Sequence, residues 1–225
     1  MLQVEGLCFS YHKKPLLQGL SFTVQPGECL VLAGPNGSGK STLLALLAGI
    51  LKPDAGRITA DSRPGYMPQG TALFEDMSVD ANLSFFADLA GASVPSPLPF
   101  GLEDFRRRKV SRLSGGMARR VSLCCALLGD PPVILLDEPC AGLDVRFRDE
   151  LQQLVPVWKQ QGRSVIYVSH DPAEFYSFYD RLMLFDGSLF PVFSKGQLSG
   201  SSGDAITEIQ QLNRLYREAC ASVRP

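Results

Sequence analysis

The chain has 225 residues, and its 22 Lys and Arg residues nearly balance its 23 Asp and Glu residues, giving a net charge of −1. This length and a hydrophobic content of 45% allow one large domain with a complete core, while the charge balance argues against general nucleic-acid binding. No apolar run reaches the ~18 residues of a membrane span, and residues 1–14 lack the order of a signal peptide, so we expect a soluble intracellular protein.

The first thirty residues alternate between apolar and polar positions around a Pro26-Gly27 turn, which predicts antiparallel strands. Residues 28–34 (ECLVLAG) follow as an apolar run typical of a buried strand, and residues 41–51 (STLLALLAGIL) then predict a helix. Short strands are expected at 57–61 and 63–69.

The pattern becomes helical from about residue 75 to residue 128. Helices are expected at 79–91, 102–110 and 115–130, with a proline-rich break at 93–101.

Beyond this helical stretch, apolar strands alternate with helices. Buried strands are predicted at 133–137 and 164–169, helices at 145–162 and 173–183, and a hairpin around Asp186-Gly187. Such alternation favours an α/β fold with a parallel sheet covered on both faces, preceded by an antiparallel β subdomain.

The expected domain organisation is one domain over 1–195 with an inserted helical lobe at about 71–128, a linker at 196–204 and a C-terminal helix at 205–225. Ile206, Ile209, Leu212, Leu215 and Tyr216 give this last helix an apolar face, which we expect to pack on the protein itself. The six cysteines show no CxxC spacing and are interpreted as small buried hydrophobic residues.

Residues 34–42 (GPNGSGKST) have the GxxxxGK[ST] spacing of a phosphate-binding loop, between a predicted strand and a predicted helix. Glycines let successive backbone N–H groups surround a phosphate, Lys40 would neutralise its charge, and Ser41 would ligate Mg²⁺. The candidate nucleotide-binding residues here are Gly34, Pro35, Asn36, Gly37, Ser38, Gly39, Lys40, Ser41 and Thr42.

An acidic pair follows the predicted strand VILLDEP. Asp137 suits the Mg²⁺ shell, and Glu138 could act as the general base on the water that attacks the γ-phosphate. Gln69, His170 and Tyr11 are weaker candidates when each is taken alone.

A second glycine turn, Ser114-Gly115-Gly116, precedes the predicted helix at 115–130, so it offers another helix N-terminus to an anion. One molecule does not need two such cradles for one nucleotide. Two molecules arranged head to tail would use both, because each would contribute its second turn to the ATP of the other.

Taken together, these segments resemble the ATP-binding cassette (ABC) family over nearly all of residues 1–195. Residues 34–42 match the Walker A loop, LSGGM at 113–117 the signature loop, and VILLDEP at 133–139 the Walker B strand. Met117 departs from the glutamine that is usual at the fifth signature position.

The remaining motifs appear in the family's order. Tyr11 matches the aromatic that stacks on adenine, Gln69 the Q-loop glutamine near Mg²⁺ and water, Asp144 the D-loop aspartate, and His170 the switch histidine. The resemblance implies that Ser114, Gly115 and Gly116 contact the γ-phosphate held by the partner subunit, while Gln69 and His170 sense the γ-phosphate beside the general base Glu138.

The resemblance also implies ATP and Mg²⁺ as cofactors, a homo- or heterodimer, and peripheral attachment to the cytoplasmic face of a membrane through a separate integral-membrane permease. Residues 79–91 and 118–144 look slightly more like those of exporter-type cassettes than like those of importers. The helical lobe would receive the permease, and its apolar residues Phe74, Met77, Leu83, Phe85 and Phe86 are either contacts for it or the lobe's own core.

Two alternatives stay open. A soluble assembly ATPase, such as the iron–sulfur scaffold type, would carry the same motifs without a transport role. The basic stretch 106–112 with Arg119 and Arg120 could meet nucleic acid, although a solvated face beside the signature loop is the better interpretation and no nucleic acid is expected.

Overall fold

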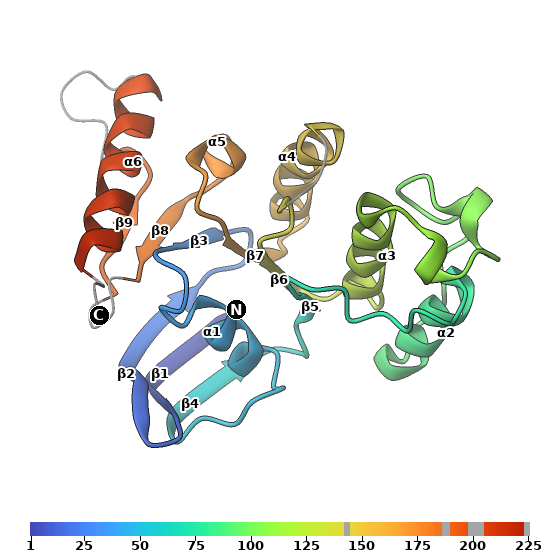
Figure 1. Ribbon diagram of the computed structural model, residues 1–225. Helices are drawn as coiled ribbons and strands as arrows, with labels where there is room; N and C mark the ends of the chain where they lie inside the picture. Colours follow the sequence, from blue (N-terminus) through green and yellow to red (C-terminus); the bar gives the residue numbers. More distant parts are fainter. Residues whose placement is uncertain (142–144, 186–189, 198–204, 223–225) are drawn as a thin grey trace.

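The computed structural model describes residues 1–141, 145–185, 190–197 and 205–222, which form two sheets and a separate group of helices (Figure 1). The strands of these residues are β1 (Leu2–Tyr11), β2 (Lys14–Val24), β3 (Cys29–Ala33), β4 (Ala55–Ala60), β5 (Gly65–Met67), β6 (Val133–Asp137), β7 (Ser164–Val168), β8 (Arg181–Leu184) and β9 (Val192–Ser194). The helices are α1 (Lys40–Leu47), α2 (Val79–Ala90), α3 (Gly115–Leu127), α4 (Val145–Gln160), α5 (Pro172–Phe175) and α6 (Ala205–Ser222).

The larger sheet has the order β5-β6-β7-β3-β8-β9 and is parallel except for β9, while β2-β1-β4 form an antiparallel sheet. Strands β3, β6 and β7 are buried at every position, as expected for parallel strands covered on both faces. The α/β fold predicted from the sequence is thereby confirmed. Because parallel strands share a direction, the segments that follow β3, β5, β6 and β7 all leave the same edge of the sheet.

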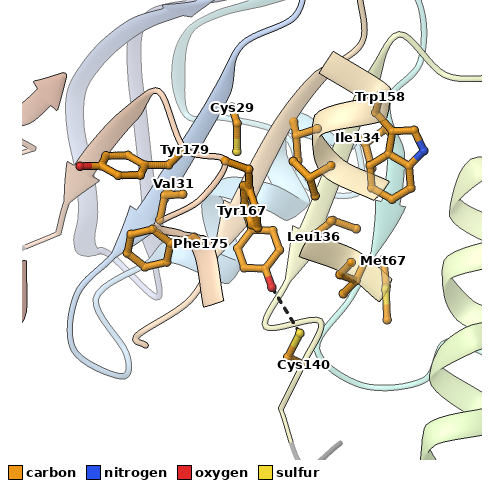
Figure 2. Packing of buried hydrophobic residues seen from close by; sticks show 14 of the residues in the cluster. Cys29, Val31, Met67, Ile134, Leu136, Cys140, Trp158, Tyr167, Phe175 and Tyr179 are labelled. Carbon is orange, nitrogen blue, oxygen red and sulfur yellow. Dashed lines mark hydrogen bonds between the residues drawn. The ribbon is translucent and has the colours of Figure 1, made fainter. Parts of the chain in front are cut away.

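Two hydrophobic cores cover the two faces of the larger sheet. Helix α1 lies between the two sheets, where Leu43, Leu44 and Leu47 pack against β1, β2 and β3. The opposite face packs against α4, α5 and α6, and Figure 2 shows its centre around Tyr167, whose hydroxyl lies 3.4 Å from the Cys140 sulfur.

A third core holds the helical segment together. Val79, Leu83 and Ala87 of α2 pack against Val121 and Cys124 of α3. Figure 1 shows these two helices beyond the β5 edge of the larger sheet. Leu83 is therefore a core residue, whereas Phe74 and Phe85 are 44% and 41% exposed.

The predicted helix at 102–110 is wrong: only two short 3₁₀ turns form in this region, at Glu103–Phe105 and Val110–Arg112. The carbonyls of Arg106 and Arg108 accept hydrogen bonds from the backbone N–H groups of Asp80 and Val79 at the start of α2. The segment uses its backbone to cap α2, so those carbonyls do not build a continuous helix of their own.

The helix predicted at 173–183 is also much shorter, because α5 ends at Phe175. Asp180 binds the first residue of β3 twice: its N–H donates to the Cys29 carbonyl at 3.0 Å, and its carboxylate accepts from the Cys29 N–H at 2.7 Å. These bonds draw the chain onto the sheet before β8. The predicted hairpin is confirmed by the antiparallel β8–β9 pairing, while its turn at Asp186-Gly187 lies outside the described residues.

Helix α6 packs on the larger sheet's α5 side, as its apolar face predicts. Leu212 is 2% exposed, and Leu215 and Tyr216 pack against the same core. Glu208 is 3% exposed, and its carboxylate accepts hydrogen bonds from the hydroxyls of Tyr176 and Tyr179 and from the backbone N–H of Gly196. Most of the predicted linker at 196–204 lies outside the described residues.

Replacing Glu208 by Ala should loosen α6, because two tyrosine hydroxyls lose a charged acceptor. We expect a loss of about 1–3 kcal/mol in unfolding free energy, measured by urea denaturation, together with faster proteolysis after residue 195. Glu218→Ala, on an exposed position of the same helix, should stay within about 0.5 kcal/mol of the wild type. Equal effects of the two substitutions would contradict this anchoring role.

Among the described residues, no helix combines the length and the apolar character that crossing a membrane requires.

Candidate active site

The loop at 34–42 connects β3 to α1 and wraps around its own lysine. Lys40 is 6% exposed, and its Nζ donates hydrogen bonds to the carbonyls of Gly34 at 2.8 Å and Pro35 at 2.7 Å. Gly34 has a φ of 147°, and a Cβ at this position would lie 2.4 Å from the Phe185 carbonyl oxygen. Because only glycine fits at this close approach, the packing of the loop requires glycine as its first residue.

The carboxyl end of β6 faces the start of α1. Ser41 Oγ donates to Asp137 Oδ1 at 3.2 Å, and Asp137 is 2% exposed. Burial raises the pKa of Asp137, and the Ser41 hydrogen bond opposes that rise. Burial, followed by the nearby Asp137 carboxylate, raises the pKa of Tyr66 to about 12.

Glu138 follows Asp137 in an unusual backbone conformation. Its φ is +45°, in the left-handed region that a residue with a Cβ rarely adopts, at a cost of about 1 kcal/mol. Its N–H donates to the Val168 carbonyl at 3.2 Å, which ties the turn to the end of β7. Backbone strain of this kind is common at active sites, where the surrounding structure holds a side chain in one orientation.

Gln69 and His170 meet the Glu138 side chain from the two neighbouring strands. Gln69 Nε2 donates to Glu138 Oε2 at 3.0 Å, and His170 Nδ1 lies 3.9 Å from Glu138 Oε1. The structure therefore brings together three candidates that are up to 101 positions apart in the sequence (170 − 69). The segments that follow parallel strands leave the sheet at the same edge, which explains this grouping.

The second glycine turn begins α3. Ser114 is the N-cap residue, and its Oγ accepts from the Met117 N–H at 3.3 Å. Ser114 and Gly115 are exposed, and within the described chain no hydrogen bond joins them to the loop at 34–42. In Figure 1, α3 and α1 lie on different sides of the β5–β6 end of the sheet.

Tyr11 lies next to the turn between β1 and β2, 47% exposed, with its ring packed edge-on against Phe9 at 4.9 Å. Asp144, the remaining candidate, lies outside the described residues.

Sequence reasoning missed Arg119, which it placed in a surface basic cluster. Arg119 is 5% exposed, and its guanidinium donates to the carbonyls of Gln69 at 2.6 Å and Glu138 at 2.7 Å. Helical spacing carries a signal for this burial, because Ser122, Leu123 and Ala126 lie three, four and seven positions later and are also buried. Arg120 is also not part of a free basic surface, since it pairs with Glu150.

Comparisons with known proteins agree with this geometry. Residues 17–141 match the sequence profile of the family described as ABC transporter. The linearmycin resistance ATP-binding protein LnrL of Bacillus subtilis is 32% identical over 93% of this chain and 74% of its own length. The taurine import ATP-binding protein TauB of Yersinia pestis is 37% identical over 77% of this chain and 75% of its own length.

A solved structure with a closely similar fold is described as the ATP-binding subunit of an ABC transporter. It has a TM-score of 0.85 and 26% identity, and the match covers 97% of this chain and 99% of that one. With the family profile spanning more than half of the chain, these matches establish that the protein belongs to the ABC transporter family, as an ATP-binding subunit with ATPase activity.

Proposed function

We propose that this subunit binds MgATP at the 34–42 loop and hydrolyses it with Glu138 as general base. The observation that carries this proposal is the Glu138 carboxylate, held at the end of β6 by a strained backbone and contacted by Gln69 at 3.0 Å. A carboxylate so placed can accept a proton from a water attacking the γ-phosphate. Gln69 and His170 flank it and would orient that water, while Tyr11 would stack on the adenine.

The donor set at the start of α1 suits Mg²⁺. Ser41 Oγ and Asp137 Oδ1 are hard oxygen ligands 3.2 Å apart, and Mg²⁺ commonly binds through one or two protein oxygens together with phosphate oxygens. Ser41, Asp137 and Gln69 are the residues proposed to hold it. When bound, the ion would neutralise phosphate charge, and its own charge would oppose the effect of burial on the Asp137 carboxyl.

The proposed working unit is a head-to-tail dimer with two composite sites. Ser114 and Gly115 are exposed and form, with the partly exposed Gly116, a helix N-terminus that could bind an anion through its N–H groups and its dipole. The lack of hydrogen bonds from this turn to the 34–42 loop in the described chain suits contact with the partner's γ-phosphate. Asp144 is proposed to lie at the same interface.

A groove of 620 Å³ between α2, α3 and β5 is the proposed docking site for the membrane permease. Apolar side chains line it, among them Phe86, Ile50 and Leu89, of which the last two are 64% and 60% exposed. An amphipathic helix of the permease could bury these side chains. The movement that accompanies ATP-driven closure of the dimer would then be transmitted to the permease. The name of TauB states import, that of LnrL states resistance, and the family is described as ABC transporter, which together favour transport over assembly, while export stays a prediction.

The test is capture of the permease by tagged Glu138→Gln protein with MgATP from detergent-solubilised cells of its source. We expect a protein with several membrane spans to co-purify, which would show that the subunit attaches to the membrane through a permease; the cytoplasmic face is the proposed location. Leu89→Asp should abolish this capture, whereas Val192→Asp, an exposed apolar position on β9, should retain it. A soluble scaffold as the only captured partner would instead support the assembly alternative.

A further inference from the structure

Arg119 is a buried cation whose described hydrogen bonds all go to backbone carbonyls. Its Nη1 donates to Pro68 at 2.7 Å and to Gln69 at 2.6 Å, and its Nη2 donates to Glu138 at 2.7 Å and to Asp137 at 3.4 Å. Burial lowers the pKa of the guanidinium, and the nearby Asp137 carboxylate opposes this effect. A guanidinium remains protonated in proteins, so these are charge-assisted hydrogen bonds.

The four carbonyls belong to two segments that follow neighbouring strands. Pro68 and Gln69 leave β5, and Asp137 and Glu138 leave β6, which pairs with β5 in parallel. One planar side chain therefore joins α3 to both segments at the point where Gln69 Nε2 meets Glu138 Oε2. The fork geometry of arginine makes this possible, because its two terminal nitrogens reach two pairs of acceptors at once.

Helix α3 is also fixed to β5 by close backbone packing. A Cβ built at Gly65 would lie 1.9 Å from the Ala126 carbonyl oxygen, so the strand and the helix touch where only glycine fits. Two contacts, near the beginning and near the end of α3, therefore fix the helix to the β5 edge. A displacement of α3 would be carried to Gln69 and Glu138.

We propose that Arg119 is a positioning residue that fixes Gln69 and Glu138 to the helix whose N-terminus meets the partner subunit's ATP. This inference rests on the proposed function of the Ser114 turn and of Gln69. Ser114 caps the same helix five positions before Arg119, so each catalytic group is mechanically tied to the turn that serves the other composite site. Neither glutamine nor lysine could replace the fork, because neither can donate to both carbonyl pairs in this geometry.

The first test uses nucleotide-free protein and amide hydrogen exchange. Arg119→Gln and Arg119→Lys should both increase exchange in peptides covering residues 66–72, because local opening of that segment becomes easier. Arg120→Gln removes the neighbouring arginine, whose partners are Glu150 and the Phe100 carbonyl, and should leave exchange there unchanged. Unchanged exchange in both Arg119 variants would overturn the proposal. Wild-type protection of residues 66–72 in Arg119→Lys would also overturn it, because the charge of Arg119 alone would then be sufficient.

The second test is a double-mutant cycle on the ATPase rate at saturating MgATP. Gln69→Ala should lower the rate about tenfold in the wild type but less than about twofold in the Arg119→Gln background, because the contact with Glu138 is already lost. If the fold-reductions in rate caused by the two substitutions simply multiply in the double variant, Arg119 supports folding only and the proposal is overturned. If Gln69→Ala has no effect in the wild type, the proposed role of Gln69 fails, while the exchange experiment still decides the role of Arg119.

Folding is checked separately for each variant. Arg119→Gln retains two N–H donors and Arg119→Lys retains the charge, so the two variants test different losses. If Arg119→Gln unfolds, the cycle and the exchange measurement are run with Arg119→Lys. ATP binding at the 34–42 loop should change less than about threefold in either variant, since the described hydrogen bonds of Arg119 go to residues outside that loop.

Discussion

Glu138→Gln lowers the rate of ATP hydrolysis by ~10² or more and leaves ATP bound, because an amide cannot accept the proton of the attacking water. The substitution keeps nearly the same shape, and the amide can still contact Gln69. The expected result is therefore a loss of turnover without a comparable loss of nucleotide affinity. Single-turnover hydrolysis and equilibrium ATP binding, measured on the same preparation, separate the two quantities.

The matched control is Glu5→Gln, which changes the same functional group on an exposed position of β1. Its hydrolysis rate should stay within about twofold of the wild type, since surface changes away from the site have small effects. Wild-type turnover by Glu138→Gln would remove Glu138 from the role of general base and leave the phosphate loop as a binding site only.

Ser114→Arg abolishes ATP-dependent dimerisation while ATP still binds at the 34–42 loop. The arginine would fill the exposed N-terminus of α3, where the partner's γ-phosphate is expected, and its bulk would keep the two subunits apart. Size-exclusion chromatography in the Glu138→Gln background with MgATP measures the effect. A dimer peak that persists would contradict the proposed contact between subunits.

The substitution also removes an N-cap, which by itself destabilises the protein by about 1 kcal/mol. Ser78→Ala provides the comparison, because Ser78 caps α2 in the same manner by accepting from the Ala81 N–H at 3.1 Å. This variant should lose similar stability and still dimerise. If it also fails to dimerise, the effect of Ser114→Arg reflects lost stability and not a blocked interface.

The parts of the fold that the sequence predicts well are those with strong local signals. Buried strands such as β3 and β6 are continuous apolar runs, and the phosphate loop has a fixed spacing between a strand and a helix. The convergence of Gln69, Glu138 and His170 could be expected from the family's motifs and from the parallel order of the strands. The roles assigned to these residues stay predictions.

The parts that the sequence misses depend on partners far along the chain. Residues 102–110 have helical composition, yet their carbonyls cap α2, and no local pattern reveals that competing use. The β1–β2 turn places His12 and Lys13 at positive φ without a glycine, so the usual turn signal is missing. The burial of Arg119 likewise depends on carbonyls some fifty positions before it and some twenty after it, as well as on its own helix.

The left-handed backbone at Glu138 has a consequence for attempts to make this protein more robust. Glycine adopts that conformation without the steric penalty, and asparagine adopts it more readily than glutamate. Laboratory evolution that selects only for resistance to heat would therefore be drawn toward replacing Glu138. Given the proposed role of Glu138 as general base, the most heat-tolerant descendants would bind ATP without hydrolysing it, so any such selection has to include turnover as a criterion.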